Sequence, residues 1–95
     1  MNIRWSPQAF AALEAQIGRL NELNPGSGDR LAEVIRDRVA QLADFAMSGR
    51  VVPEYNEVGL REVVVRRYRV LYHLGADGIE VVTLFHGSMS LDINE

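Results

Sequence analysis

The spacing of the apolar residues changes period near the middle of the chain, and this change limits the possible folds more than any other feature. Up to about residue 46, apolar side chains recur every three or four positions, which is typical of amphipathic helices. From Leu60 onward the sequence is rich in β-branched and aromatic residues, several of which alternate with polar ones, as in strands. A helical half followed by a strand-forming half predicts an α+β domain.

The first half contains a short predicted strand and two predicted helices. Residues 3–5 alternate in polarity, and Ser6-Pro7 then predicts a helix start, because Ser is a preferred N-cap and Pro has no N–H to leave unpaired. Asn24-Pro25-Gly26 ends this helix, and a second is expected from about residues 27–29 to Ser48-Gly49. The predicted apolar faces are Phe10, Leu13, Ile17 and Leu20 on the first helix, and Leu31, Val34, Ile35, Val39, Leu42, Phe45 and Ala46 on the second. The short break predicts an antiparallel helical hairpin.

The second half predicts three strands, over residues 60–65, 68–74 and 79–85, preceded by a loop or irregular edge over residues 51–59. Asp77-Gly78 is a strong hairpin signal, whereas the link at Arg66-Arg67 has no Gly or Asn, so a tight primed turn there would be unusual. One face of the middle strand, with Tyr68, Val70, Tyr72 and Leu74, is expected to meet the helices.

The expected architecture is a single domain over residues 1–95. A short N-terminal strand precedes an antiparallel helical hairpin, which packs on an antiparallel sheet completed by three C-terminal strands. The other face or edge of the sheet is expected to be free for a partner.

The composition excludes several classes of site. The chain has no cysteine, so neither a disulfide nor a thiolate metal site can form. Its two histidines show no metal-ligand spacing, and no glycine-rich phosphate loop occurs, so neither a metal nor a cofactor is expected. No signal peptide and no apolar run of membrane-spanning length is visible, so a cytoplasmic protein that does not contact membranes is expected.

The charge of the chain is unevenly distributed. All ten basic residues are Arg, and the net charge is −3, which argues against direct DNA binding by charge alone. Residues 50–69 nevertheless carry five Arg against three acidic residues, a local net charge of +2. The positive charge is thus concentrated in one short segment, in which Arg50, Arg66 and Arg67 are predicted to contact a target or a partner protein. For Arg66-Arg67 the alternative is a solvated turn.

Five short motifs follow one another along the predicted elements. They are Trp5-Ser6-Pro7 with Ala9, Gly49-Arg50-Val51-Val52-Pro53-Glu54, Leu60-Arg61-Glu62, Tyr68-Arg69-Val70-Leu71-Tyr72 and Phe85-His86-Gly87. In this order and spacing they resemble the RelE/ParE toxin superfamily over nearly the whole chain. The resemblance implies the growth-inhibiting toxin of a type II toxin–antitoxin system, which a cognate antitoxin neutralises by wrapping its C-terminal segment around the toxin.

The superfamily divides in activity, and the resemblance does not by itself choose between the branches. RelE-like members cleave mRNA in the ribosomal A site, whereas ParE-like members poison DNA gyrase. RNA cleavage requires a base, an acid and cations around the phosphate, and Glu54, Arg61, Arg69 and His86 are the candidates for these roles. The alternatives are structural: Arg61 pairs with Glu62 or Glu54, Arg69 holds a carboxylate of the loop or of the antitoxin, and His86 caps a turn.

The chain departs from the superfamily pattern after His86-Gly87. Many members continue with two Arg, whereas this chain has Ser88 and Met89. The loss of two cations weakens the case for an RNase, which depends on positive charge around the scissile phosphate. Three hypotheses remain: a ParE-like gyrase inhibitor, a ribosome-dependent mRNA endonuclease, and a non-toxic remnant that only binds antitoxin. Whether the chain is an enzyme stays open.

Overall fold

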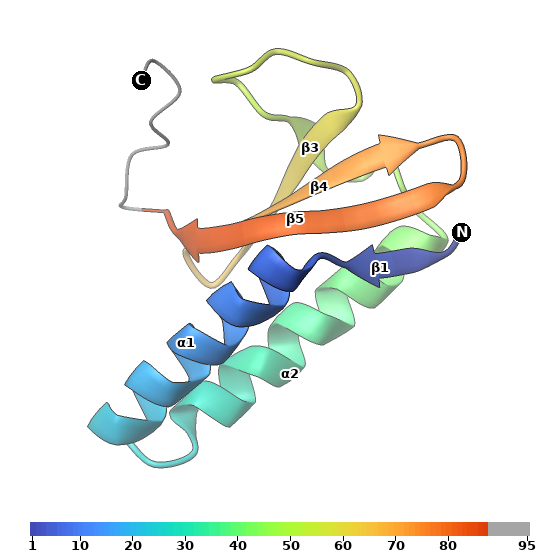
Figure 1. Ribbon diagram of the computed structural model, residues 1–95. Coiled ribbons are helices and arrows are strands. Elements are labelled where there is room, and N and C mark those ends of the chain that lie inside the picture. The colour runs from blue at the N-terminus through green and yellow to red at the C-terminus, as the bar shows by residue number, and fades with distance from the viewer. Residues whose placement is uncertain (88–95) are drawn as a thin grey trace.

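A computed structural model describes residues 1–87 of the chain and confirms the α+β class (Figure 1). The helices are α1 (Pro7–Leu23), α2 (Ser27–Ala40) and a 3-10 helix (Gln41–Ala43). The strands are β1 (Ile3–Trp5), β2 (Arg50–Val51), β3 (Leu60–Val65), β4 (Tyr68–Gly75) and β5 (Gly78–His86). The predicted strands of the second half agree with β3, β4 and β5 to within one residue at each end.

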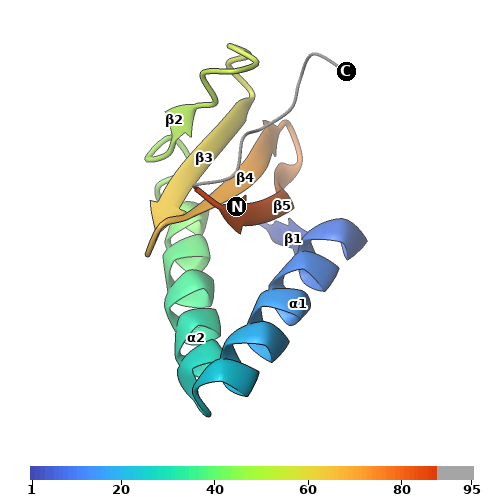
Figure 2. The same cartoon turned by 90° about the vertical axis from the view of Figure 1, so that its left-hand side faces the viewer.

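The five strands form one sheet in the order β1-β5-β4-β3-β2. Strand β1 pairs in parallel with β5, and the other three pairs are antiparallel. The helical hairpin lies on one side of the sheet, and the loop between β2 and β3 rises on the other side (Figures 1 and 2). Part of that second face is therefore not covered by a helix.

The start of α1 follows the predicted capping. Ser6 Oγ accepts a hydrogen bond from the Ala9 N–H at 3.0 Å and donates one to the Val82 carbonyl of β5 at 2.9 Å. Pro7 occupies the first turn, where its missing N–H costs nothing. The N-cap therefore also fixes the helix to the sheet.

The two helices meet closely near their connection. A Cβ atom at Gly28 would lie 2.2 Å from the Ile17 carbonyl oxygen, which is closer than any side chain allows. Asn21 Oδ1 also accepts the Gly28 N–H at 2.8 Å. Glycine at this position thus allows the backbones of the hairpin to touch.

Two predicted core positions on the helices are wrong. Phe10 is 56% exposed, because Ala9 faces the sheet and the next residue points about 100° away around the helix. Phe45 is 66% exposed, because α2 ends at Ala40 instead of continuing to Ser48-Gly49.

The chain leaves the helical path at the end of α2 and is held against the sheet instead. After a 3-10 turn, Tyr72 Oη of β4 donates to the Ala46 carbonyl at 2.7 Å and accepts the Gly49 N–H at 3.1 Å. These two bonds satisfy backbone groups that a continued helix would have paired internally.

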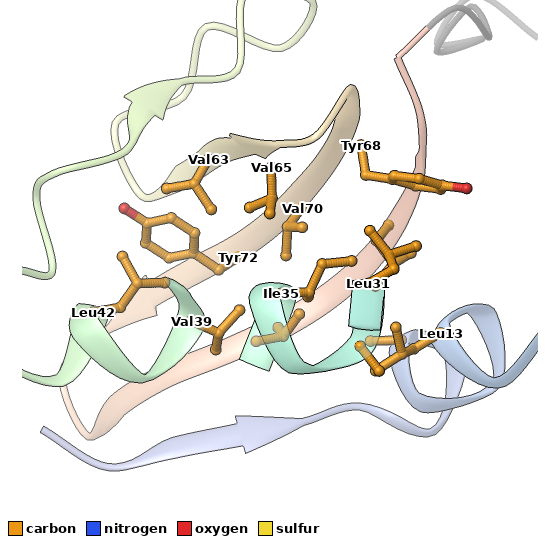
Figure 3. Packing of buried hydrophobic residues seen from close by; sticks show 14 of the residues in the cluster. Leu13, Leu31, Ile35, Val39, Leu42, Val63, Val65, Tyr68, Val70 and Tyr72 are labelled. Atoms are coloured by element: carbon orange, nitrogen blue, oxygen red, sulfur yellow. The ribbon is translucent and has the colours of Figure 1, made fainter. Parts of the chain in front are cut away.

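The core lies between the helices and the sheet (Figure 3). Tyr68 and Tyr72 are buried in it as predicted, together with Val70 of the same strand. Val52 and Leu71 are also buried but lie outside this cluster, which is consistent with the loop after β2 covering part of the opposite face.

The β3–β4 connection is a tight two-residue turn, contrary to the expectation that such a turn would be unusual there. Arg66 and Arg67 have φ angles of 49° and 72°, so both residues adopt the left-handed conformation. Val65 pairs directly with Tyr68 across the turn. Because a left-handed residue other than Gly costs about 1–2 kcal/mol, the strand pairing on either side must hold this turn in place.

Candidate functional site

The sheet face opposite the helices carries Arg50 and Arg69, and Glu54 of the loop after β2 binds Arg69 there. Strand register sets the residues of this face in two rows: Val64 lies opposite Arg69, which lies opposite Phe85, and the adjacent row contains Arg50, Glu62 and Leu71. Since alternate residues of a strand point to the same face, these side chains lie on the side away from Val63, Val65 and Val70.

Arg69 is the centre of a network of ion pairs on this face. Its Nη1 and Nη2 atoms bind the two carboxylate oxygens of Glu54, at 2.7 and 2.8 Å, and its Nε binds Glu62 Oε1 at 2.7 Å. The guanidinium also lies 5.4 Å from the centre of the Phe85 ring, within reach of a cation–π contact. Only 12% of the Arg69 side chain is exposed, so the loop residue Glu54 and the strand residue Glu62 satisfy it from two sides.

Glu62 is the site residue that the sequence analysis missed. Its side chain is fully buried, and its second oxygen accepts the Nε–H of Arg50 at 2.5 Å. Glu62 thereby links Arg50 of β2 to Arg69 of β4. The available signal was strand alternation, which places Glu62 on the face opposite Val63 and Val65 and therefore on the same face as Arg69.

The Arg69 contact controls the titration of Glu54. Hydrogen bonds from the Arg69 guanidinium lower the pKa of Glu54 from 4.5 to about 2, against the opposing effect of burial. The same bonds raise the pKa of Arg69 above its ordinary value. A carboxylate with a pKa of about 2 is a weak base, so Glu54 is poorly suited to accept the proton of a ribose hydroxyl near neutral pH.

Arg61 is separated from Glu54 and Arg69, and so is the His86 side chain, which pairs with Tyr68 and points to the helix side of the sheet. The Arg61 guanidinium donates to the carbonyl oxygens of Gly49 at 3.0 Å and Val58 at 3.1 Å, and the residue is 9% exposed. Arg61 pairs with Tyr72 across the strands and so points to the face opposite that of Arg69. The suggested ion pairs of Arg61 with Glu62 or Glu54 are therefore wrong, whereas the suggestion that Arg69 holds a carboxylate of the loop is confirmed.

A hollow of about 390 Å³ lies beside the network. It is lined by Arg50, Val64, Arg67, Arg69, His86 and Gly87, and we refer to it as the basic hollow. His86 lines the end of the hollow, but its ring makes an edge-on contact with the core residue Tyr68, at 5.3 Å between ring centres. Arg66 is exposed on the adjoining turn but does not line the hollow. The positions of the missing Arg pair, Ser88 and Met89, lie outside the described residues.

A second hollow, of about 500 Å³, lies by the β4–β5 hairpin and includes none of the predicted site residues. Its exposed pair, Arg4 and Glu80, is already joined at 3.0 Å. Within residues 1–87, no three His, Asp or Glu side chains converge on a point where they could hold a metal ion. No helix in this part of the chain is long and apolar enough to cross a membrane.

Comparison with known proteins shows the family to which the chain belongs. Residues 3–91 match the family model described as the ParE toxin of the type II toxin–antitoxin system parDE. No curated protein sequence matches the chain. Among solved structures, the chromosomal ParDE toxin–antitoxin system from P. aeruginosa has a similar fold, with a TM-score of 0.77 and 19% sequence identity. That match covers 90% of this chain and 95% of the other.

Proposed function

This chain belongs to the ParE family of type II toxins, and from that membership we propose that it arrests growth by binding and inhibiting DNA gyrase, and that a cognate antitoxin neutralises it. The proposal treats the toxin as an inhibitor that acts by binding and has no chemistry of its own.

The state of Glu54 is the observation that carries this proposal over RNA cleavage. Both of its oxygens bind Arg69, and its pKa of about 2 leaves it without the affinity for a proton that a general base needs. The cation that would bind the scissile phosphate is occupied by the same contact. Arg61, the second candidate cation, points to the other face of the sheet. The set needed for RNA cleavage is therefore not assembled at one point.

The antitoxin half of the proposal is supported by the family and by the open face of the sheet. Toxins of this family belong to type II toxin–antitoxin systems, in which the toxin is paired with an antitoxin. The open face carries an exposed apolar residue, Val64, between charged neighbours, and this combination is common at protein–protein contacts.

A supercoiling assay tests the gyrase proposal. Purified toxin added to DNA gyrase and relaxed plasmid should reduce supercoiling in a dose-dependent way, and addition of the antitoxin encoded beside the toxin gene should restore it. Glu54→Gln protein, checked for folding by circular dichroism, should inhibit as well as wild type, because Glu54 does no chemistry. Normal supercoiling at high toxin concentration, together with mRNA cleavage on ribosomes that Glu54→Gln abolishes, would instead support the endonuclease. Expression without antitoxin that leaves growth unchanged would identify a non-toxic remnant.

A further inference from the structure

We propose that the basic hollow binds an acidic side chain of the antitoxin, with its carboxylate between Arg50 and Arg67 and a neighbouring apolar side chain on Val64. This inference rests on the proposed function, because it names the part of the toxin surface and the chemistry through which the antitoxin is recognised.

The first support comes from the cations that remain available. Arg69 is satisfied within the chain, since Glu54 and Glu62 accept from three of its nitrogen atoms. Arg50 uses only its Nε–H, toward Glu62, and its side chain is 64% exposed. Arg67 is exposed, and its guanidinium has no acceptor among residues 1–87. Toward residues 1–87, the hollow therefore presents two guanidinium groups with unused donors, which suits a carboxylate.

The second support is the apolar floor of the hollow. Val64 is 60% exposed, because β2 pairs only with Arg61 and Glu62 and leaves Val64 without a neighbouring strand on that side. Arg69 lies directly opposite it on β4. An apolar residue exposed between guanidinium groups favours a ligand that combines a carboxylate with an apolar side chain, as an extended acidic peptide does.

The local charge favours such a peptide over a nucleic acid. Arg50, Arg67 and Arg69 contribute three positive charges around the hollow, and Glu54 and Glu62 remove two of them. A nucleic acid would bring a phosphate at every nucleotide. The phosphates next to the bound one would approach the carboxylate of Glu54, whose side chain is 28% exposed. The net charge of −3 on the whole chain would also repel them. A single carboxylate matches the small local excess of positive charge.

The backbone at Arg67 adds an independent observation. Arg66 and Arg67 both adopt left-handed conformations that Gly or Asn would adopt more easily. Strain of this kind tends to persist where the side chain has a role that the easier residue cannot fulfil. The turn places Arg67 at the edge of the hollow, where Gly or Asn would supply no cation.

Measurements of antitoxin binding test the inference with matched variants. Surface plasmon resonance would give the Kd for the antitoxin encoded beside the toxin gene with wild type, Arg50→Gln, Arg67→Gln and the control Arg36→Gln. Arg36 is exposed on α2 and has no partner among residues 1–87, so the control removes the same charge from another surface. Each hollow variant should raise the Kd at least tenfold, as expected for a lost charge-assisted bond, and Arg36→Gln less than twofold.

A second set of measurements identifies the ligand chemistry and guards against misfolding. Arg67→Lys, which keeps the charge but loses the planar fork, should fall between wild type and Arg67→Gln. The acidic residues of the antitoxin's C-terminal segment are then replaced one at a time by the corresponding amides. One of these replacements should raise the Kd for wild-type toxin but leave the Kd for Arg67→Gln toxin unchanged. A 12-nucleotide single-stranded RNA should bind weakly and without dependence on Arg67.

The possible outcomes distinguish failure of the proposed binding site from failure of the proposed function. If wild-type toxin does not bind the antitoxin, the proposed function fails. If it binds and the Kd of folded Arg50→Gln and Arg67→Gln stays within threefold of wild type, the inference fails and the function stands. RNA binding as tight as antitoxin binding, and lost in Arg67→Gln, would overturn the acidic-peptide ligand in favour of a phosphodiester.

Discussion

Arg69 connects the loop after β2 to the sheet through a single side chain. Its guanidinium binds Glu54 of the loop and the buried Glu62 of β3, so the position of residues 52–59 depends on two carboxylates. A buried charge is tolerated only when it is paired, and loss of one partner leaves an uncompensated buried charge that destabilises the fold. Residues first considered for catalysis are thus held in a structural network.

The pH dependence of stability should report the Glu54 contact. The pKa of Glu54 is about 2 in the folded protein against 4.5 in the unfolded chain, so the carboxylate stabilises the fold above about pH 4.5. This contribution is lost as the pH falls toward 2. At pH 7, Glu54→Gln should lower the free energy of unfolding by about 2 kcal/mol, less than the full shift implies because the carboxylate is partly exposed. The difference from wild type should shrink between pH 4.5 and 2.

Urea denaturation followed by the fluorescence of Trp5, the single tryptophan, measures this difference at each pH. Glu57→Gln is the matched control, because Glu57 is exposed in the same loop and its side chain has no partner among residues 1–87. A Glu54→Gln protein that is as stable as the Glu57→Gln protein at pH 7 would contradict the prediction.

At the level of single residues, the sequence identified the charged residues but not their pairing. The motifs that contain Glu54, Arg69 and His86 predict a role for each, and the structure joins Glu54 to Arg69, whereas His86 pairs with Tyr68 on the helix side of the sheet. Glu62 was not selected, because its importance arises from its burial between Arg50 and Arg69, which are 12 and 7 residues away along the chain. Such contacts depend on which strands lie side by side, and a local stretch of sequence does not specify the partner strand.

Among the elements, the β3–β4 turn combines strain with a proposed binding role. Replacing Arg66 by Asn and Arg67 by Gly should increase the free energy of unfolding by about 1–2 kcal/mol, because these residues adopt left-handed conformations readily. The same variant should bind the antitoxin more weakly, since it lacks the Arg67 guanidinium. Urea denaturation and surface plasmon resonance measure the two effects on one sample. Stability that is unchanged or lower would show that the native turn is not strained.

The elements also show where periodicity is a reliable guide. Capping at Ser6-Pro7 and the Asp77-Gly78 turn are local signals, and both are confirmed. The end of α2, in contrast, is not determined by local sequence. The apolar pattern continues to Ala46, but the chain leaves the helix after Ala40, and the bonds that Tyr72 makes to the following segment come from a strand about 25 residues later. Tertiary contacts of this kind override helix periodicity.

For the molecule as a whole, the fold class could be predicted because the two halves differ in period and the motifs follow the same order as the elements. The parallel pairing of β1 with β5 could not be read from local patterns, because it joins residues that are 76 positions apart. The site could be predicted in part. The motifs identify Arg50, Glu54 and Arg69 but not Glu62, and the opposite orientation of Arg61 depends on strand alternation and register together.

The distribution of charge over the whole molecule predicts how the toxin behaves toward DNA. With a net charge of −3 and a pI of about 5.3, and with Arg69 neutralised internally, the toxin alone should not bind duplex DNA at physiological salt. A gel-shift assay with a 30-base-pair duplex should show no complex for the toxin alone up to about 100 µM, a concentration at which basic proteins bind DNA non-specifically. Any shift with the antitoxin present should then come from the antitoxin. A complex formed by the toxin alone, weakened by added salt and lost in Arg50→Gln protein, would show that the basic hollow recognises phosphates and would contradict this prediction.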